Sequence, residues 1–175
     1  NCTFCNPACL KILGFESEEE LLGQHIHNLI HHTRPNGEPY PANECLIYKA
    51  FQDEKGSHVD NEVLWRKDGT SFPVEYWSYP IFRNNKTIGS VVAFLDITER
   101  KQVEEELHET RAQLDIAIES IADGFALFDG EDRFVFANSA YRESHKELGD
   151  TELPGMKFEE IVRHLASKGF YGNTP

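Results

Sequence analysis

Histidine and cysteine, two residue types that often bind transition metals, are concentrated in the first 45 residues of the chain. A string of four histidines, HIHNLIHH, covers residues 25–32, and Cys45 follows a loop that contains three prolines. The prolines stiffen this loop and Asn36-Gly37 turns it, so its two ends can lie close together. His31, His32 and Cys45 are therefore candidate ligands of a divalent metal or of a small polar molecule.

The same side chains could bind the iron of a haem, because imidazole and thiolate are both haem-iron ligands. In that case His31, His32 or Cys45 would be the axial ligand. The alternative is an ordered loop that covers the core, with the histidines at the surface or at helix ends.

The other three cysteines form a C-x2-C-x3-C motif that could suit an iron–sulfur or zinc site with Cys45 as the fourth ligand. We expect Cys2 and Cys5 on a strand, where residues of odd separation face opposite sides, and Cys9 on the following helix. Buried cysteines that act as small apolar residues are therefore the stronger interpretation. Their crowding is unlike a secreted disulfide framework and favours a reducing cytoplasm.

The composition predicts a globular chain that is not an enzyme. Of the 175 residues, 39% are hydrophobic and 27% are charged, which is enough to build a core. The formal charge of −13 would repel nucleic acid and anionic lipid, and no apolar run is long enough to span a bilayer. We find no glycine-rich phosphate loop, no nucleophile motif with a paired base and no HExxH motif.

The elements that position these residues repeat along the chain, at an offset of 132 residues and without a gap. The offset aligns Asn6 with Asn138, Gly23 with Gly155 and His32 with His164. The shared pattern is a short strand, an Asn-x-Ala sequence that opens a helix, and a glycine followed by a second helix. We therefore expect two copies of one small domain.

Only the first copy continues into further elements. The pattern predicts a short helix over residues 42–51 and strands over residues 59–65, 71–82 and 87–95. Lys67-Asp68-Gly69 and Arg83-Asn84-Asn85-Lys86 are typical of hairpin turns, so the three strands should be antiparallel and consecutive.

Residues 98–122 contain no glycine or proline and predict one long helix. Its apolar residues have the a/d spacing of a coiled-coil seam, and most other positions are charged. A parallel homodimer would bury this seam, and a helix packed on its own domain is the alternative. The seam comprises Val103, Leu107, Thr110, Leu114, Ala117 and Ile121.

These motifs resemble the PAS domain family, as two PAS domains in tandem of which the first carries a C-terminal PAC segment. The matching residues are Asn6-Pro7-Ala8, Leu13-Gly14-Phe15, Leu22-Gly23, Trp65 to Gly69, Phe72-Pro73-Val74, Asp96 to Lys101, Ile121 to Asp129, Asn138 and Tyr141.

The resemblance implies an α+β fold, with a five-stranded antiparallel sheet, short helices on one face, and a cavity that senses a ligand, cofactor, redox state or light. It divides the chain into a PAS/PAC domain at residues 1–97 without its first strand, a coiled-coil signalling helix at 98–122, and the N-terminal part of a second PAS domain at 123–175. Residues 2–5 would then form an exposed sheet edge. In haem-binding members the ligand usually lies on the helix that corresponds to residues 44–51, which has no histidine here.

Two further sets of residues have expected roles. Trp65, Tyr76 and Phe94 fall on the predicted strands, where they could line a ligand pocket or stack on a flavin, or could simply pack in the core. Asp96-Ile97-Thr98 joins the last strand to the long helix. We expect Thr98 to cap that helix, and we expect this junction to transmit a change in the sheet to the coiled coil.

The resemblance implies a sensory segment of a cytoplasmic bacterial signalling protein, a piece of a longer chain with its output domain beyond residue 175. A sensor histidine kinase or a diguanylate cyclase is the suggested parent. A homodimer and a small-molecule ligand are the expected partners, and the sequence identifies no particular cofactor. Two alternatives stay open: a ligand-free PAS scaffold for dimerisation, and a haem- or metal-dependent redox sensor.

Overall fold

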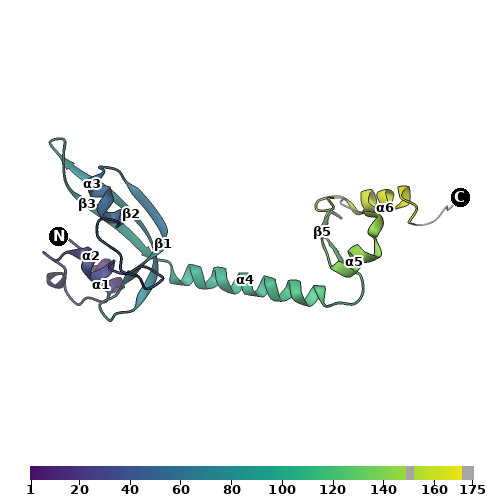
Figure 1. The fold of residues 1–175 in the computed structure, drawn as a ribbon, viewed down its shortest axis with the longest axis horizontal. Coiled ribbons are helices and arrows are strands. Elements are labelled where there is room, and N and C mark those ends of the chain that lie inside the picture. The colour runs from purple at the N-terminus through teal and green to yellow at the C-terminus, as the bar shows by residue number, and fades with distance from the viewer. Residues whose placement is uncertain (149–151, 171–175) are drawn as a thin grey trace. The chain divides into compact units, whose positions relative to one another are not determined.

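The structure is a computed structural model that describes residues 1–148 and 152–170 of the chain. The chain forms two compact units, Asn1–Glu105 and Glu106–Pro175 (Figure 1). We describe each unit by itself.

Unit 1 is built on a three-stranded antiparallel sheet of β1 (Ser57–Trp65), β2 (Ser71–Arg83) and β3 (Lys86–Asp96). The strands are neighbours in chain order, as the alternating pattern predicted. Both turns use backbone conformations that favour glycine or asparagine: Gly69 has φ +82°, and Asn84 and Asn85 have φ +51° and +57°. The three predicted strands and their two hairpin turns are therefore confirmed.

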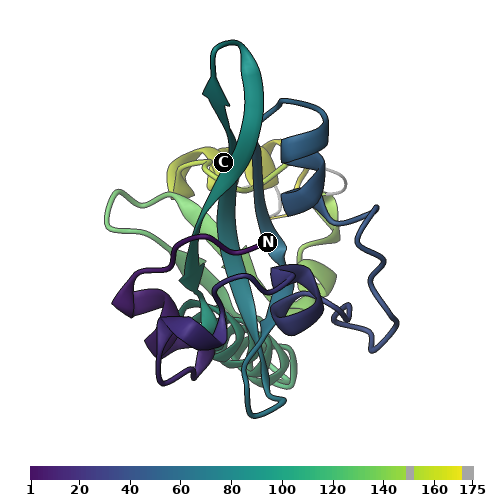
Figure 2. The ribbon, with the colours of Figure 1, turned by 90° about the vertical axis from the view of Figure 1, so that its left-hand side faces the viewer.

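Helices cover one face of this sheet (Figure 2). They are α1 (Pro7–Leu13), the 3-10 helix η1 (Glu18–Glu20), α2 (Ile26–Ile30) and α3 (Leu46–Gln52). Alternate side chains of β2 are buried beneath them, whereas Tyr79 on β2 and Val91 and Leu95 on β3 are more than half exposed. The core consists of Cys5, Leu13, Leu21, Ile30, Val59, Leu64, Phe72, Val74 and Tyr76.

The sheet of unit 1 has three strands in the described residues, not the expected five, and residues 2–5 form no strand. The expectation of an exposed sheet edge there is therefore wrong, and Cys5 is buried. Unit 2 supplies the physical reason: the repeat counterpart of residues 2–5 does form a strand, because it pairs with the strand before it. The described residues of unit 1 contain no counterpart of that partner strand, and a strand without a hydrogen-bonding partner is not stable.

The long helix α4 spans Thr98–Glu119, slightly less than the predicted 98–122. None of its residues is buried, so its apolar seam is not covered in the described structure; Val103, Leu107 and Leu114 are 58%, 69% and 57% exposed. The helix is long enough to cross a bilayer, but its surface is densely charged. Among the described residues, no helix combines the length and the apolar character of a membrane span.

The described residues of unit 2 contain the C-terminal part of α4, a two-stranded antiparallel sheet and two further α-helices. The strands are β4 (Ala126–Phe128) and β5 (Phe134–Ala137), and the helices are α5 (Ser139–Ser144), the 3-10 helix η2 (Lys146–Leu148) and α6 (Phe158–Ser167). Their core consists of Phe134, Ala137, Leu148, Leu153, Ile161 and Leu165.

The predicted repeat is confirmed by hydrogen bonds that recur at the same offset. In unit 1, Gly23 N donates to Cys2 O at 2.8 Å, and in unit 2 Gly155 N donates to Phe134 O at 2.9 Å. Both glycines have positive φ, +76° and +83°. The asparagines also match, because each caps its helix with a side-chain oxygen that accepts from the backbone N–H three residues on. The two units therefore share one local structure.

Candidate functional site

Unit 1 contains a group of polar side chains buried between its helices and its sheet. His31 directly follows α2 and is 1% exposed. Its Nδ1 lies 3.2 Å from Cys45 Sγ, and its Nε2 lies 2.9 Å from Glu62 Oε2. The contact with Glu62 is short but poorly aligned for a hydrogen bond, so we describe it as an ion pair. We call the whole group the buried polar cluster; it comprises His27, His31, Tyr40, Cys45, Glu62 and Tyr76.

Two tyrosines complete the contacts of the Glu62 carboxylate. Tyr76 donates a hydrogen bond from its hydroxyl to Oε2 at 2.7 Å, and the Tyr40 hydroxyl lies 2.9 Å from Oε1. The rings of Tyr40 and Tyr76 also pack edge-on against His31, with centroids 5.0 and 5.9 Å from its ring. The carboxylate therefore has a partner on each of its two oxygens in a largely buried site.

A β-bulge places Glu62 on the buried side of the sheet. Val59 pairs with Tyr76. Glu62 is three residues further along β1, but it pairs with Val74, which is only two residues from Tyr76 on β2. Both of these β2 residues face the core, so Val59 and Glu62 share a face although their separation is odd. In an unbroken strand Glu62 would face the side opposite to Val59.

The cluster holds a buried charge pair. Burial alone would lower the pKa of His31, but its contacts with Cys45 and Glu62 outweigh this effect and raise the pKa to about 9. Burial alone would raise the pKa of Glu62, but the contacts with His31, Tyr76 and Tyr40 hold it below its ordinary value. Burial raises the pKa of both tyrosines. At neutral pH His31 and Glu62 therefore carry opposite charges, which makes either one costly to remove alone.

His27 lies on α2 beside His31 and is 7% exposed. Its Nε2 lies 2.8 Å from the carbonyl oxygen of Tyr40, whereas its Nδ1 is buried and has no hydrogen-bond partner among the described residues. Burial lowers the pKa of His27, so its ring is neutral at pH 7. The donor atoms of His27, His31 and Cys45 all lie within 4.8 Å of one another.

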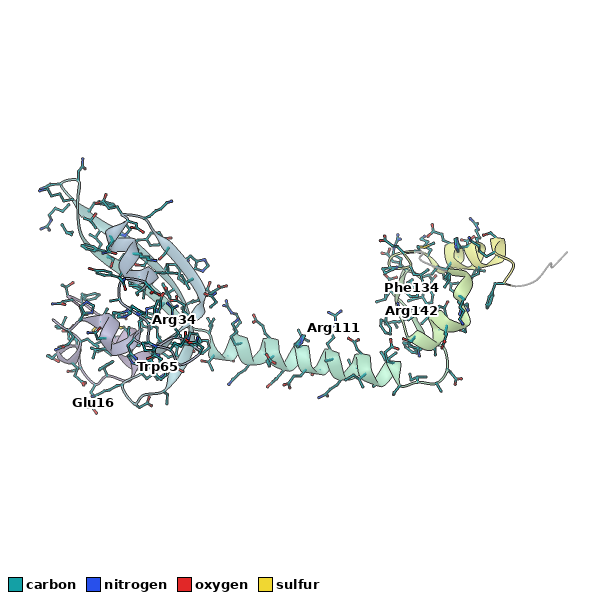
Figure 3. The ribbon with its side chains drawn as sticks, in the orientation of Figure 1. Glu16, Arg34, Trp65, Arg111, Phe134 and Arg142 are labelled. Atoms are coloured by element: carbon teal, nitrogen blue, oxygen red, sulfur yellow. The ribbon has the colours of Figure 1, made fainter. Side chains whose placement is uncertain are left out.

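The structure separates His32 and Trp65 from the cluster. The exposed His32 ring stacks on Trp65, with centroids 5.2 Å apart, and Trp65 Nε1 donates to the carbonyl of Thr33 at 2.9 Å. These contacts attach the loop after α2 to β1. Trp65 is labelled in Figure 3 together with Arg34, whose guanidinium packs over the Tyr40 ring.

The cluster thus contains three of the six predicted ligand-binding residues, namely His31, Cys45 and Tyr76. Phe94, on β3, packs against the apolar core instead. Sequence reasoning did not select His27, Tyr40 or Glu62. The spacing of four residues between His27 and His31 was a usable signal, because such residues lie on one face of a helix. Nothing in the sequence marked the bulge that brings Glu62 to them.

The cysteines of the C-x2-C-x3-C motif lie apart from this site. Cys2, Cys5 and Cys9 pack on the core of unit 1, and burial raises the pKa of the Cys9 thiol to about 11. Within residues 1–148 and 152–170, the one group of three potential metal ligands whose donor atoms converge is that of His27, His31 and Cys45. All four cysteines are free thiols.

A haem does not fit beside His31 in this arrangement, because the rings of Tyr40 and Tyr76 pack against the imidazole where a porphyrin would lie. Two hollows on the described structure lie away from this cluster. One is an open groove where β3 meets α4, and the other is in unit 2.

The junction between β3 and α4 is fixed by Asp96 and Ile97. One oxygen of the Asp96 carboxylate accepts from the backbone N–H of Thr98 at 2.9 Å, and Ile97 is 4% exposed. Ile97 N also donates to the carbonyl of Pro73 on β2 at 3.1 Å. The expectation that Thr98 caps the helix is wrong, because Thr98 is its first residue and its hydroxyl donates to Asp96. Asp96 satisfies the N–H that lacks a helical partner.

Two arginines connect this junction to the rest of unit 1. Arg66, at the end of β1, donates to the carbonyl of Ile12 on α1 at 3.0 Å and to Asp96 Oδ2 at 2.6 Å. Arg100, in the first turn of α4, pairs with Glu75 on β2 at 2.8 Å. The start of α4 is therefore attached to the end of β1 and to the middle of the sheet.

The other end of α4 is attached to unit 2 through Asn138. This side chain is 0% exposed, and its Nδ2 lies 3.3 Å from the carbonyls of Ile118 and Ile121 and 2.9 Å from that of Asp123. Its Oδ1 accepts from the N–H groups of Phe125 and Tyr141. One buried amide therefore joins the end of α4 to the start of α5.

Unit 1 is thus an antiparallel sheet with helices on one face, a buried polar cluster between them, and a last strand that runs into a helix. Two family models, both described as PAS domain, match residues 1–99 and 111–166. The chain therefore belongs to the PAS domain family. PAS domains are sensory and signalling modules. No curated protein matches the chain.

Proposed function

We propose that this chain senses a chemical signal in unit 1 and transmits it through α4. The observation that carries the proposal is the junction at residues 96–98. The last strand of the sheet continues directly into α4, and the connecting Ile97 is buried and bonded to β2. A change in the sheet must therefore move the start of the helix.

The buried polar cluster is the proposed sensing site. It lies at β1 and β2, and Arg66, the residue directly after β1, binds Asp96 just before α4. A change in the charge or contacts of His31 and Glu62 would alter the bulge in β1 and so the position of Arg66. The proposed route runs along β1 from Glu62 to Arg66, and from Arg66 to Asp96 before α4.

We also propose that α4 pairs with α4 of a second copy. A 22-residue helix with no buried residue has little stabilisation of its own, and the a/d spacing of its apolar residues is the pattern of a two-helix seam. The proposed seam residues on α4 are Val103, Leu107, Leu114 and Ala117, with Thr110 between them; Ile121, which the sequence also placed in the seam, lies beyond the end of α4.

The experiment that tests this pairing places a charge in the seam. Leu107→Glu and Leu114→Glu should each convert the dimer to a monomer, measured by analytical ultracentrifugation. Ala112→Glu adds the same charge to the same helix outside the seam and should leave the dimer intact. If the seam variants stay dimeric, α4 is not the interface, and the exposed face of the sheet in unit 1 becomes the candidate.

The finer assignment follows from the family. We propose a sensor histidine kinase or a diguanylate cyclase as the parent protein, with a C-terminal output domain, and the cytoplasm as its compartment. The four free cysteines support a reducing environment. The second candidate is a ligand-free scaffold that only dimerises, and the close packing of the tyrosines around His31 favours it.

A further inference from the structure

Two imidazoles and one thiol converge inside unit 1, and all three are buried. Convergence alone does not define a metal site, because buried polar groups often satisfy one another. A metal site also needs a lone pair on each donor atom. The contacts of the two imidazoles indicate which nitrogen of each ring can offer one.

The tautomer of His27 follows from its surroundings. Its Nε2 faces a backbone carbonyl at 2.8 Å, and a carbonyl oxygen can only accept, so Nε2 carries the proton. In the neutral ring the lone pair is then on Nδ1. This atom is buried without a hydrogen-bond partner in residues 1–148 and 152–170. An unsatisfied buried acceptor is costly, and it is the feature that a bound cation would explain.

His31 can offer the same nitrogen, Nδ1, once the proton on it has left. Its Nε2 faces the carboxylate of Glu62 at 2.9 Å, so this nitrogen carries a proton, and its Nδ1 faces Cys45 Sγ at 3.2 Å. A histidine whose far nitrogen donates to a carboxylate or a backbone carbonyl is the usual arrangement of a metal ligand, because that contact fixes the tautomer and the ring orientation. His27 has such a hydrogen bond to a backbone carbonyl, whereas the far nitrogen of His31 forms an ion pair with the Glu62 carboxylate at 2.9 Å.

We propose that His27 Nδ1, His31 Nδ1 and Cys45 Sγ bind one divalent metal ion, with zinc as the fitting element. Zinc binds well to imidazole nitrogen and thiolate sulfur, which are the donors present here. Magnesium and calcium prefer oxygen ligands instead. His31 Nδ1 and Cys45 Sγ must both be deprotonated to bind the metal, and the protons that they hold leave to solvent. Solvent or a small ligand would take the fourth position.

The distances require a small contraction. Zinc binds sulfur at about 2.3 Å and nitrogen at about 2.0 Å, so two tetrahedral ligands lie roughly 3.5 Å apart. The contact between Sγ and His31 Nδ1 is already this short, at 3.2 Å. The candidate donor atoms lie within 4.8 Å of one another, so the widest separation must close by up to about 1 Å when the metal binds.

This inference rests on the proposed function in one respect: zinc would be the signal, or the structural centre, of the sensing unit. Binding and transmission are separate claims and need separate measurements. Zinc that binds at this site without changing the pairing of α4 would support the site and contradict its role in signalling.

The first test adds Co²⁺ alone to the purified, metal-free chain, because cobalt reports its ligands by its colour. We expect a thiolate-to-cobalt charge-transfer band in the near ultraviolet and the visible bands of four-coordinate cobalt, both saturating at one equivalent. Zn²⁺ should displace the cobalt. Absence of the charge-transfer band would overturn the proposal.

Single variants assign the band to residues. Cys45→Ser should abolish the charge-transfer band, and His27→Gln should weaken Co²⁺ binding by about 100-fold or more, since it removes a direct ligand. The controls are Cys5→Ser, which removes another buried thiol, and His32→Gln, which removes the neighbouring exposed histidine. A band that survives Cys45→Ser and disappears in Cys5→Ser would overturn the assignment.

A measurement on the unaltered chain covers the case of variants that do not fold. X-ray absorption at the zinc edge of the loaded chain should show one sulfur at about 2.3 Å and imidazole nitrogens at about 2.0 Å. A shell with no sulfur, or with three or four sulfurs, would contradict the site regardless of the variants.

Discussion

The sharpest test of the buried polar cluster is Glu62→Gln, which keeps the size of the side chain and removes its charge. The substitution leaves His31 buried without its counter-charge, and the amide keeps only one of the two oxygens that the tyrosine hydroxyls contact separately. We expect the free energy of unfolding of unit 1 to fall by about 2–4 kcal/mol at about pH 6.

The magnitude follows from the electrostatics of His31. Raising its pKa from 6.5 to about 9 corresponds to about 3 kcal/mol of preferential stabilisation of the charged ring. Glu62 shares this effect with Cys45, and the lost tyrosine contact adds about 1–3 kcal/mol.

The pH dependence has a definite sign. Because the folded pKa of His31 is raised, its contribution is complete below about pH 6.5 and is lost as the pH rises through about 9. The pKa of Glu62 is lowered, so its contribution is present above its ordinary value of 4.5 and is lost as the pH falls through the folded pKa. The difference between wild type and variant should therefore be largest at about pH 5–6.5 and shrink toward about pH 10.

The assay is urea unfolding followed by tryptophan fluorescence, with a chelator present so that no metal competes for His31. The chain has two tryptophans, Trp65 and Trp77, and both lie on the sheet of unit 1, so the signal reports this unit. Asp60→Asn, at an exposed position of the same strand, is the matched control and should change the stability by less than about 0.5 kcal/mol. A Glu62→Gln variant as stable as the control, or an equal loss at about pH 6 and about pH 10, would refute the charge pair.

Two further predictions use contacts at the ends of the helices. Asn138→Ala should lower the stability of unit 2 by about 2–4 kcal/mol, because it removes a helix cap and a buried amide; Asn6→Ala, its exposed counterpart in the repeat, should cost unit 1 about 1 kcal/mol. Thermal unfolding by circular dichroism compares the two, and equal losses would contradict the role of Asn138. Arg66→Lys keeps the charge but cannot bridge Ile12 and Asp96 together, so amide hydrogen exchange at residues 98–104 should accelerate while exchange in α5 stays unchanged. Unchanged exchange at residues 98–104 would show that Arg66 does not hold the junction.

The regular parts of the fold could be predicted because they depend on local patterns. The three strands of unit 1 alternate apolar and polar residues, and their turns contain Gly69 and Asn84-Asn85, which few other residues replace at positive φ. The repeat was visible because Asn6 caps a helix and Gly23 adopts a positive φ, and few other residue types suit these two positions. The absence of glycine and proline was enough to define α4.

The prediction was incomplete where a contact depends on residues distant in sequence. Residues 2–5 have the composition of a strand, but a strand also needs a partner, and composition does not say whether one is present. Glu62 was missed because strict alternation along β1 puts it opposite Val59. The pairing of His31 with Cys45 was expected from the loop between them. That His27 rather than His32 lies beside His31 in the cluster depends on the direction in which each ring points, which the sequence does not reveal.

The bulge in β1 has an evolutionary consequence. It contains one residue more than regular pairing needs, so the gene can lose one codon at residues 60–61 and still keep Val59 and Glu62 on the same face. Loss of a codon between Glu62 and Trp65 would instead turn Glu62 to the other face of the sheet. Descendants of this gene that keep the buried carboxylate should therefore differ in length at the bulge. Descendants that have lost a residue between Glu62 and Trp65 should have replaced Glu62.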